Sequence, residues 1–153
     1  MKKRVVITGM GAITPIGNNI NKFWKNLQKG QNGISNISLF DTEKFDVKLA
    51  AEVNIDLNSF FSSKELNKID RFTSFALIAA DEAIKMSNIK QSNIDHSKIG
   101  VVIGSGIGGM QSLEKQHSRL LRNPKKVSPY FIPSMIPDIA AGHISIKYGF
   151  KGP

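Results

Sequence analysis

The chain of 153 residues contains no cysteine. This absence excludes disulfide bonds, thiolate metal ligands and a cysteine nucleophile within these residues. The three histidines, His96, His117 and His143, lack the spacing of metal ligands, so we expect no zinc site. No apolar run approaches the roughly 18 residues that a helix needs to span a bilayer. The composition is that of a globular protein, and we expect no membrane partner.

Acidic residues are scarce beside basic ones. Lysine and arginine number 21, aspartate and glutamate 12, and the formal net charge is +9. Such a balance attracts nucleic acid, an anionic membrane or an acidic protein. The basic residues form no run of five or six, which weakens the nucleic-acid interpretation. Glycines and β-branched residues near the basic N-terminus indicate a first strand rather than a signal peptide, and a cytoplasmic location is expected.

Apolar patterning predicts an α/β fold with a mainly parallel sheet and flanking helices. The continuous apolar runs at residues 4–9 and 98–103 predict buried strands, and residues 48–53 predict a shorter one. Helical spacing predicts helices at 19–30 and 110–122, and a helical tract at 62–86 that opens with a capping box of Ser62 and Glu65. A proline-rich loop then leads to a last helix, with Ser134 as its cap and Gly149 as its stop.

The segment "GSGIGG" at 104–109 spells the G-x-G-x-x-G pattern of dinucleotide-binding turns. Such a turn also needs a second strand that ends in an acidic residue about 20 residues further on. Pro129 lies there instead, and no acidic residue occurs between Glu114 and Asp138. No G-K-[ST] triplet follows either glycine run, which excludes a Walker A loop. We therefore expect no nucleotide cofactor, and the sequence suggests no other.

Two interpretations of these glycines remain open. Glycine lets a strand pack tightly against a helix, which is the ordinary structural role of such a run. A glycine run around one apolar side chain, Ile107, also suits the rim of a pocket, because the backbone can shift and move that side chain.

Four segments of the chain, taken together, are recognisable as a set. They are "RVVITGMGAITPIGN", "DRFTSFALIAADEA", "IGVVIGSGIGGM" and "SPYFIPSMIPDIAAGHISIKYGFKGP", in this order along all 153 residues. The set resembles the N-terminal part of the type II β-ketoacyl-acyl carrier protein synthases, the condensing enzymes of fatty acid elongation. The resemblance implies a thiolase-like fold of two similar α/β halves in layers, assembled as a homodimer. It also implies that residues 1–153 are a truncated N-terminal synthase domain holding most of the first half.

The resemblance implies a reaction as well. A cysteine accepts the acyl group from acyl carrier protein as a thioester, malonyl-acyl carrier protein loses CO₂, and the carbanion attacks the thioester. In this family the cysteine lies beyond the "KGP" that ends the sequence, and the two assisting histidines lie further on. None of His96, His117 and His143 matches them, and His143 is interpreted as a structural helix residue. No catalytic residue is therefore assigned, and the chain alone is expected to be inactive.

Supporting residues carry over from the resemblance position by position. Ile107, between Gly106 and Gly108, matches a gate at the entrance of the acyl pocket, and Phe131 and Ile132 match pocket-lining positions. Residue types alone would favour Phe131 as an ordinary core aromatic.

Docking positions for the acidic carrier protein also carry over. They are Lys64, Lys68, Lys125 and Lys126. Asn67 replaces a basic residue of some members, which weakens the patch, and a solvated lysine surface is the alternative.

Two other function classes stay open at this point. One is a non-catalytic partner similar to chain-length factors, which keep the synthase fold without the cysteine. The other is a basic nucleic-acid-binding module, although no motif combines aromatic and basic residues as such modules do.

Overall fold

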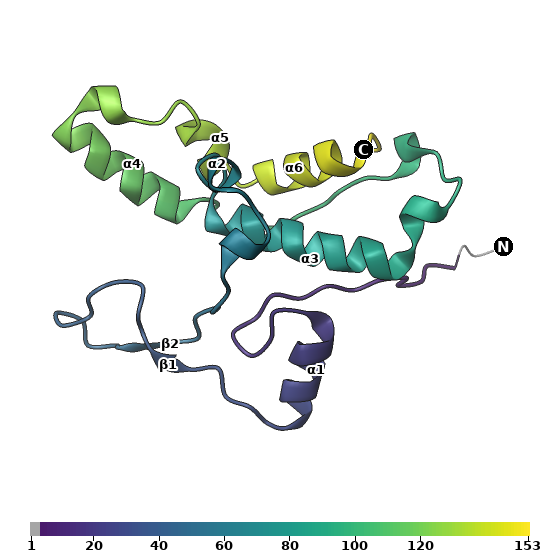
Figure 1. Cartoon of the computed structure of the whole chain (residues 1–153), viewed down its shortest axis with the longest axis horizontal. Coiled ribbons are helices and arrows are strands. Elements are labelled where there is room, and N and C mark those ends of the chain that lie inside the picture. The colour runs from purple at the N-terminus through teal and green to yellow at the C-terminus, as the bar shows by residue number, and fades with distance from the viewer. Residues whose placement is uncertain (1–3) are drawn as a thin grey trace.

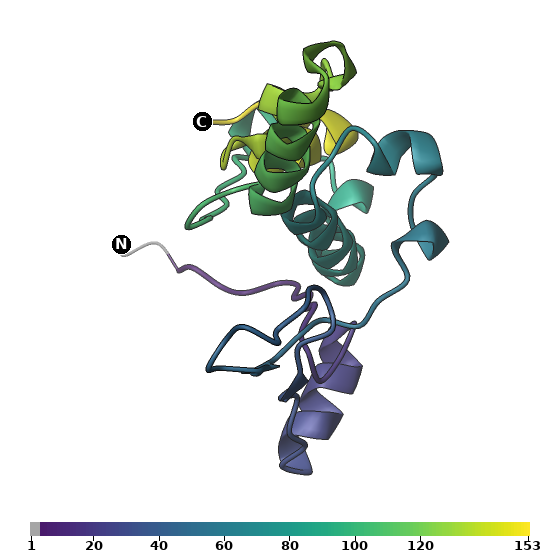
Figure 2. The ribbon, with the colours of Figure 1, turned by 90° about the vertical axis from the view of Figure 1, so that its left-hand side faces the viewer.

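The computed structural model describes residues 4–153. Figure 1 shows the long helix α3 in the middle, with α4, α5 and α6 on one side and α1 with the β1–β2 pair on the other, and Figure 2 shows the same separation from the side. In chain order the elements are α1 (Ile20–Gln28), β1 (Ser35–Asn36), β2 (Leu49–Ala50), the 3-10 helix η1 (Leu57–Ser59), α2 (Ser63–Leu66), α3 (Arg71–Ser87), η2 (Ile89–Gln91), η3 (His96–Lys98), α4 (Met110–Arg122), η4 (Pro124–Lys126), α5 (Phe131–Met135) and α6 (Ile139–Tyr148).

The small core lies where α3 and α6 pack together. Leu77 and Ile78 of α3 and Ala140 and Ile144 of α6 are buried where these two helices pack, and Phe150, just after α6, is also buried. Because α3 is alanine-rich and apolar nearly all round, other segments can pack against it on more than one side. The N-terminal segment uses a second side of the same helix.

Two glycines let the N-terminal segment lie directly on α3. A Cβ atom on Gly9 would stand 2.1 Å from the carbonyl oxygen of Ala83, and one on Gly11 would stand 1.9 Å from that of Ala79. Glu82 of α3 fixes the same segment, because its carboxylate accepts hydrogen bonds from the backbone N–H of Ala12 at 3.1 Å and of Ile20 at 2.9 Å. The first glycine pair of the sequence is thus explained by a close backbone approach.

The predicted helical tract at 62–86 is wrong as a single helix. The capping box is confirmed, since Ser62 Oγ accepts from the Glu65 N–H at 3.3 Å and the Glu65 carboxylate accepts from the Ser62 N–H at 2.8 Å. It opens only the one-turn helix α2, and Asp70 caps a new helix, α3. A second strong N-cap residue within the apolar pattern divides the tract in two.

The predicted last helix is also divided. Ser134 lies inside α5 rather than at a helix start, and α6 begins after the link 136–138. Pro137 accounts for the break, because it disfavours helical backbone in the residue before it, and Ile136 is extended at φ −65° and ψ 139°. The predicted stop at Gly149 is confirmed, with φ +69°. The helices predicted at 19–30 and 110–122 correspond to α1 and α4.

The expected parallel sheet is not formed among residues 4–153. The strand pair found there is β1 with β2, antiparallel, with Ser35 opposite Ala50. The segments 4–9 and 98–103 are not strands, and Val5 and Val102 are 94% and 91% exposed. An apolar, β-branched run shows that residues suit a covered sheet, but a strand also needs a hydrogen-bonding neighbour. Segment 98–103 has one such bond, from the Gly152 N–H to the Ile99 carbonyl at 2.9 Å.

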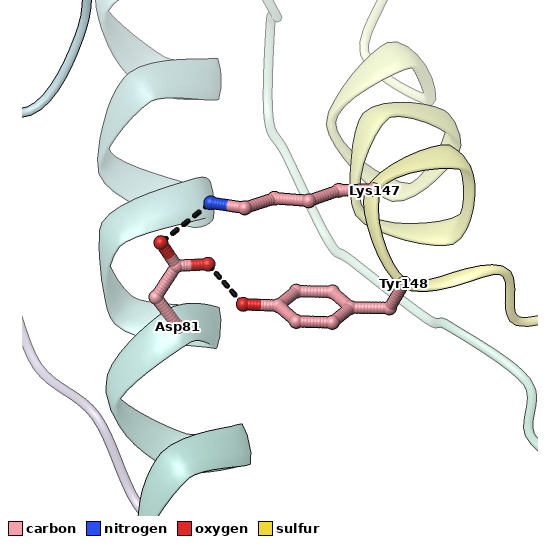
Figure 3. Close-up of polar contacts among 3 residues, drawn as sticks. All are labelled: Asp81, Lys147 and Tyr148. Carbon is pink, nitrogen blue, oxygen red and sulfur yellow. Dashed lines mark hydrogen bonds and ion pairs between the residues drawn. The ribbon is translucent and has the colours of Figure 1, made fainter. Parts of the chain in front are cut away.

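A polar contact fixes α6 to α3 at the edge of the core. Figure 3 shows Lys147 and Tyr148 of α6 reaching the same carboxylate, that of Asp81 on α3. The Lys147 Nζ lies 2.5 Å from Asp81 Oδ2, and the Tyr148 hydroxyl donates to Asp81 Oδ1. Burial, followed by the hydrogen bond and the negative charge of Asp81, raises the pKa of Tyr148 above its usual value.

We expect Tyr148 to ionise later than an ordinary tyrosine. A raised pKa in the folded state means that this contact stabilises the fold fully below the ordinary tyrosine pKa of about 10, and that the stabilisation is lost as the pH rises above it. The difference in ultraviolet absorbance between the wild-type protein and Tyr148→Phe, followed through an alkaline titration, isolates this group. An Asp81→Asn background should move the transition to lower pH, and an unmoved transition would contradict the assignment.

Candidate functional site

The loop 104–109 is fixed at one end only. At its C-terminal end the Gly108 N–H donates to Ser105 Oγ at 3.0 Å, and the Gly109 N–H donates to the carbonyl oxygen of Met135 at 2.8 Å. The first bond closes a turn within the loop, and the second holds the start of α4 against the end of α5. Gly108 has φ +82°, a left-handed conformation that favours glycine.

The four glycines of this loop divide into two kinds. A Cβ atom on Gly108 would stand 2.3 Å from the Met135 carbonyl oxygen, and one on Gly109 would stand 2.4 Å from that of Ser134. Nothing lies within 4 Å of a Cβ on Gly104 or Gly106. Tight packing therefore explains the second half of the motif, and the first half lies in open space.

Ile107 stands between the two kinds of glycine and is 69% exposed. Its side chain borders an apolar hollow of about 240 Å³ between the start of α4 and the α5–α6 link. The residues that line this hollow are Ile107, Gly109, Met110, Leu113, Met135, Ile136 and Pro137. The structure thus brings the sequence-predicted gate residue, Ile107, to an apolar hollow, whereas its neighbours Gly106 and Gly108 do not line the hollow.

Phe131 and Ile132 do not line the hollow of Ile107. Phe131 begins α5 and is half-buried, and Ile132 on the same helix is 56% exposed. Met135 and Ile136, which sequence reasoning did not single out, take the place beside Ile107. No local sequence signal marks them, because their place in the hollow depends on a contact between two distant segments, the bond from the Gly109 N–H to the Met135 carbonyl.

Asp70 is the buried polar residue that positions α4. One oxygen of its carboxylate accepts from the Phe72 N–H at 3.3 Å, and the other accepts from the Ser112 N–H at 2.8 Å. One negative charge therefore caps the N-termini of both α3 and α4, where the helix dipoles favour it. The capping residue of α3 could be read from the sequence as an aspartate before an apolar helical run, but its second helix could not.

The four predicted docking lysines are all exposed and form two pairs. Lys64 lies in α2, and Lys68 lies just after it, with its Nζ 5.2 Å from the centre of the Tyr130 ring. Lys125 and Lys126 lie in η4, which Asn123 caps by accepting from the Lys125 N–H at 3.0 Å. The Lys68–Tyr130 contact links the first pair to the loop that follows the second.

A polar hollow of about 240 Å³ separates the two lysine pairs. Its wall includes Asn67 beside the first pair, Lys115 of α4, and Ser128 beyond the second. Gln116 of α4 is buried and accepts from the Ser128 N–H at 2.9 Å, which ties the loop after η4 to α4. This bond fixes one wall of the hollow to α4.

Other candidate chemistry is not assembled in the described residues. His143 lies half-buried in α6, where burial lowers its pKa, in agreement with its interpretation as a structural residue. Residues 4–153 hold no group of three or more histidine, aspartate or glutamate side chains close enough to share a metal ion. Within the same range no helix has the length and apolar character needed to cross a bilayer.

Comparison with known proteins gives consistent results. The family description "Beta-ketoacyl synthase, N-terminal domain" matches residues 2–153. The chain is 48% identical over 153 residues to a 3-oxoacyl-[acyl-carrier-protein] synthase 2 of Staphylococcus aureus strain N315. The aligned region covers 99% of this chain and 37% of that protein. The chain thus spans well under half the length of the curated relatives it matches.

Solved structures show the same likeness. One match is a chain in the structure of a type II polyketide synthase acyl-carrier protein in complex with its ketosynthase. The TM-score is 0.78 and the identity 28%, and the match covers 100% of this chain and 42% of the matched chain. A β-ketoacyl synthase from Burkholderia phymatum matches with a TM-score of 0.79 and 24% identity, over 99% and 38%. These likenesses confirm the expected thiolase-like fold class.

The two kinds of glycine predict stability losses of different size when one methyl group is added. Gly109→Ala should destabilise the protein by about 1–3 kcal/mol, because a backbone carbonyl of α5 must move to admit the Cβ atom. Gly106→Ala, three residues away in open space, should change the stability by less than about 0.5 kcal/mol. Thermal denaturation of the two variants side by side measures the difference, and equal losses would contradict this division of the loop.

Proposed function

Because the chain belongs to the β-ketoacyl synthase family, we propose that it is the N-terminal domain of a 3-oxoacyl-acyl carrier protein synthase that elongates fatty acids in the cytoplasm. In the proposed reaction an acyl group is held as a thioester on an enzyme cysteine. Malonyl-acyl carrier protein loses CO₂, and its carbanion attacks the thioester carbonyl. The new carbon–carbon bond gives 3-oxoacyl-acyl carrier protein and releases the cysteine thiol.

The observation that carries this proposal is the position of Ile107. The residue borders an apolar hollow. The end of its loop is held by the bond from the Gly109 N–H to Met135, whereas nothing lies within 4 Å of a Cβ atom on Gly104 or Gly106. An apolar side chain on such a loop can move between two positions without disturbing α4. We assign Ile107 as the gate of the acyl pocket, with Gly106 and Gly108 as the flanking residues that permit its movement. We also assign Phe131 and Ile132 of α5, which lie outside this hollow, to a further part of the acyl pocket.

The exposed lysine pairs support a docking role. An acyl carrier protein stands in complex with the ketosynthase that matches this whole chain. We assign Lys64, Lys68, Lys125 and Lys126 to the carrier-binding surface of this domain, with malonyl and acyl thioesters delivered by that partner. Each exposed ion pair contributes only about 0.2–1 kcal/mol, so the surface guides the encounter more than it holds the complex.

Assembly with further protein is the third part of the proposal. The α4 helix exposes a row of apolar side chains, Met110, Leu113 and Leu120, on the side that borders the Ile107 hollow. Exposed apolar rows of this kind are covered in a folded assembly. We propose that a homodimer of the complete enzyme covers them.

A larger side chain at the gate should shorten the acyl group that the enzyme accepts. Ile107→Phe in the complete enzyme is expected to lower the condensation rate with long-chain primers by at least about tenfold, a cost of ~1.4 kcal/mol, and to leave short primers nearly unaffected. Ile146→Phe, at an 80% exposed position on α6, is the matched control. A primer-length profile that is the same in both variants would remove the gate assignment.

The 153-residue chain alone should form no acyl-enzyme, because it contains no cysteine to carry the thioester. Mass spectrometry after incubation with an acyl-carrier protein should show an unmodified chain, while the complete enzyme shows one acyl group. A stable adduct on the 153-residue chain would contradict this part of the proposal.

A further inference from the structure

Three basic residues of α4 lie in a row on the exposed side of the helix. Lys115, Arg119 and Arg122 are separated by four and three residues, and all three are exposed. At about 100° per residue they fall within about 60° of the helix circumference. The structure shows no ion pair to any of them within residues 4–153. We call this row the basic stripe.

The basic stripe is separated from the rest of the α4 surface. The apolar row of Met110, Leu113 and Leu120 lies on the opposite side of the helix, about 160° away. Glu114, the one acidic residue of α4, points about 100° away from Lys115. No other acidic residue occurs before Asp138. Along the chain, the positive charge of the stripe is therefore uncompensated. Across the fold, Asp70 lines the same hollow as Lys115, and its carboxylate accepts from backbone N–H groups of α3 and α4 rather than from the stripe.

The basic stripe joins the two lysine pairs into one surface. At its C-terminal end it continues into Lys125 and Lys126 of η4, which follows α4 after one residue. At its other end Lys115 shares the polar hollow with Asn67, which lies between Lys64 and Lys68 in the sequence. Figure 1 shows η4 beyond the far end of α4. The stripe thus occupies the space that two separate pairs would leave between them.

We propose that the basic stripe is part of the carrier-binding surface, and that Lys115, Arg119 and Arg122 bind acidic side chains on a helix of the acyl carrier protein. The proposal rests on the proposed function. Two observations select this occupant: the uncompensated charge, which calls for an acidic partner, and the continuity of the stripe with lysines already assigned to the same partner. A row on one straight helix suits a second helix laid along it better than it suits a loop.

The stripe also compensates for a position where the surface is weak. Asn67 is uncharged and lies between Lys64 and Lys68. Lys115 reaches the same hollow from α4 and supplies a positive charge there. The carrier should therefore be drawn further along α4 than the four lysines alone would place it.

The test reverses charge in the complete enzyme. Arg119→Glu/Arg122→Glu is compared with Lys125→Glu/Lys126→Glu and with a control, Lys25→Glu/Lys29→Glu, at the C-terminal end of α1 on the other side of α3. All three variants change the net charge by the same amount. The stripe pair and the control pair each lie at the C-terminal end of a helix. The rate of acyl transfer is measured from an acyl-carrier protein and from acyl-coenzyme A, which lacks the carrier surface.

The stripe variant should lose about tenfold in transfer rate from the carrier at ~50 mM salt, and the loss should shrink to about twofold at ~0.5 M because salt screens the attraction. Transfer from acyl-coenzyme A and the rates of the control should stay within about twofold of wild type. A stripe variant that matches the control with the carrier overturns the inference, while the lysine comparison still tests the docking surface.

Two further outcomes separate this inference from others. If the wild-type enzyme transfers acyl groups from neither donor, the proposed function fails and the inference fails with it. If the stripe variant loses binding to vesicles of anionic phospholipid but keeps normal transfer from the carrier, the stripe serves a membrane surface and the inference is overturned.

Discussion

The carboxylate of Asp70 is the interaction on which the arrangement of the site depends. It is buried, and it accepts one backbone N–H from the first turn of α3 and one from the first turn of α4. The first turns of both helices therefore meet at a single acidic group. The loop that carries Ile107 ends at Gly109, a Cβ of which would lie 3.0 Å from the same carboxylate. A side chain longer than aspartate, or an uncharged one, could not serve both helices and leave this space.

The same carboxylate explains why two proposed features meet in this region. Lys64 in α2 and Lys68 just after it precede Asp70 by a few residues, and Ile107 precedes the start of α4 by three. The proposed carrier-binding surface and the apolar hollow beside Ile107 are therefore both built next to the N-terminal turns of α3 and α4.

Local features could be predicted from the sequence, and features that depend on distant residues could not. The capping box of Ser62 and Glu65, the helix of residues 110–122 and the stop at Gly149 follow from short-range rules, and all are present. The prediction of a parallel sheet was wrong because an apolar run does not specify which segment will be its hydrogen-bonding neighbour. The segments of Val5 and Val102 form no strand in the structure, and both side chains are exposed. The second helix of Asp70 and the lining residue Met135 were missed for the same reason, since both depend on contacts across the fold. The resemblance supplied the fold class and Ile107, which residue spacing alone had left open between packing and a pocket.

The connection between α3 and the N-terminal region has a consequence for how the molecule opens. The region of α1 and the β1–β2 pair lies on the other side of α3 from the core, and Glu82 with the two glycine contacts holds its first segment there. Few buried apolar side chains contribute to this attachment, whereas α3 and α6 share the buried cluster around Ile144. The protein therefore consists of two cooperative units of unequal stability, and the weaker one can detach and exchange its amide hydrogens while the helices that carry the site stay folded.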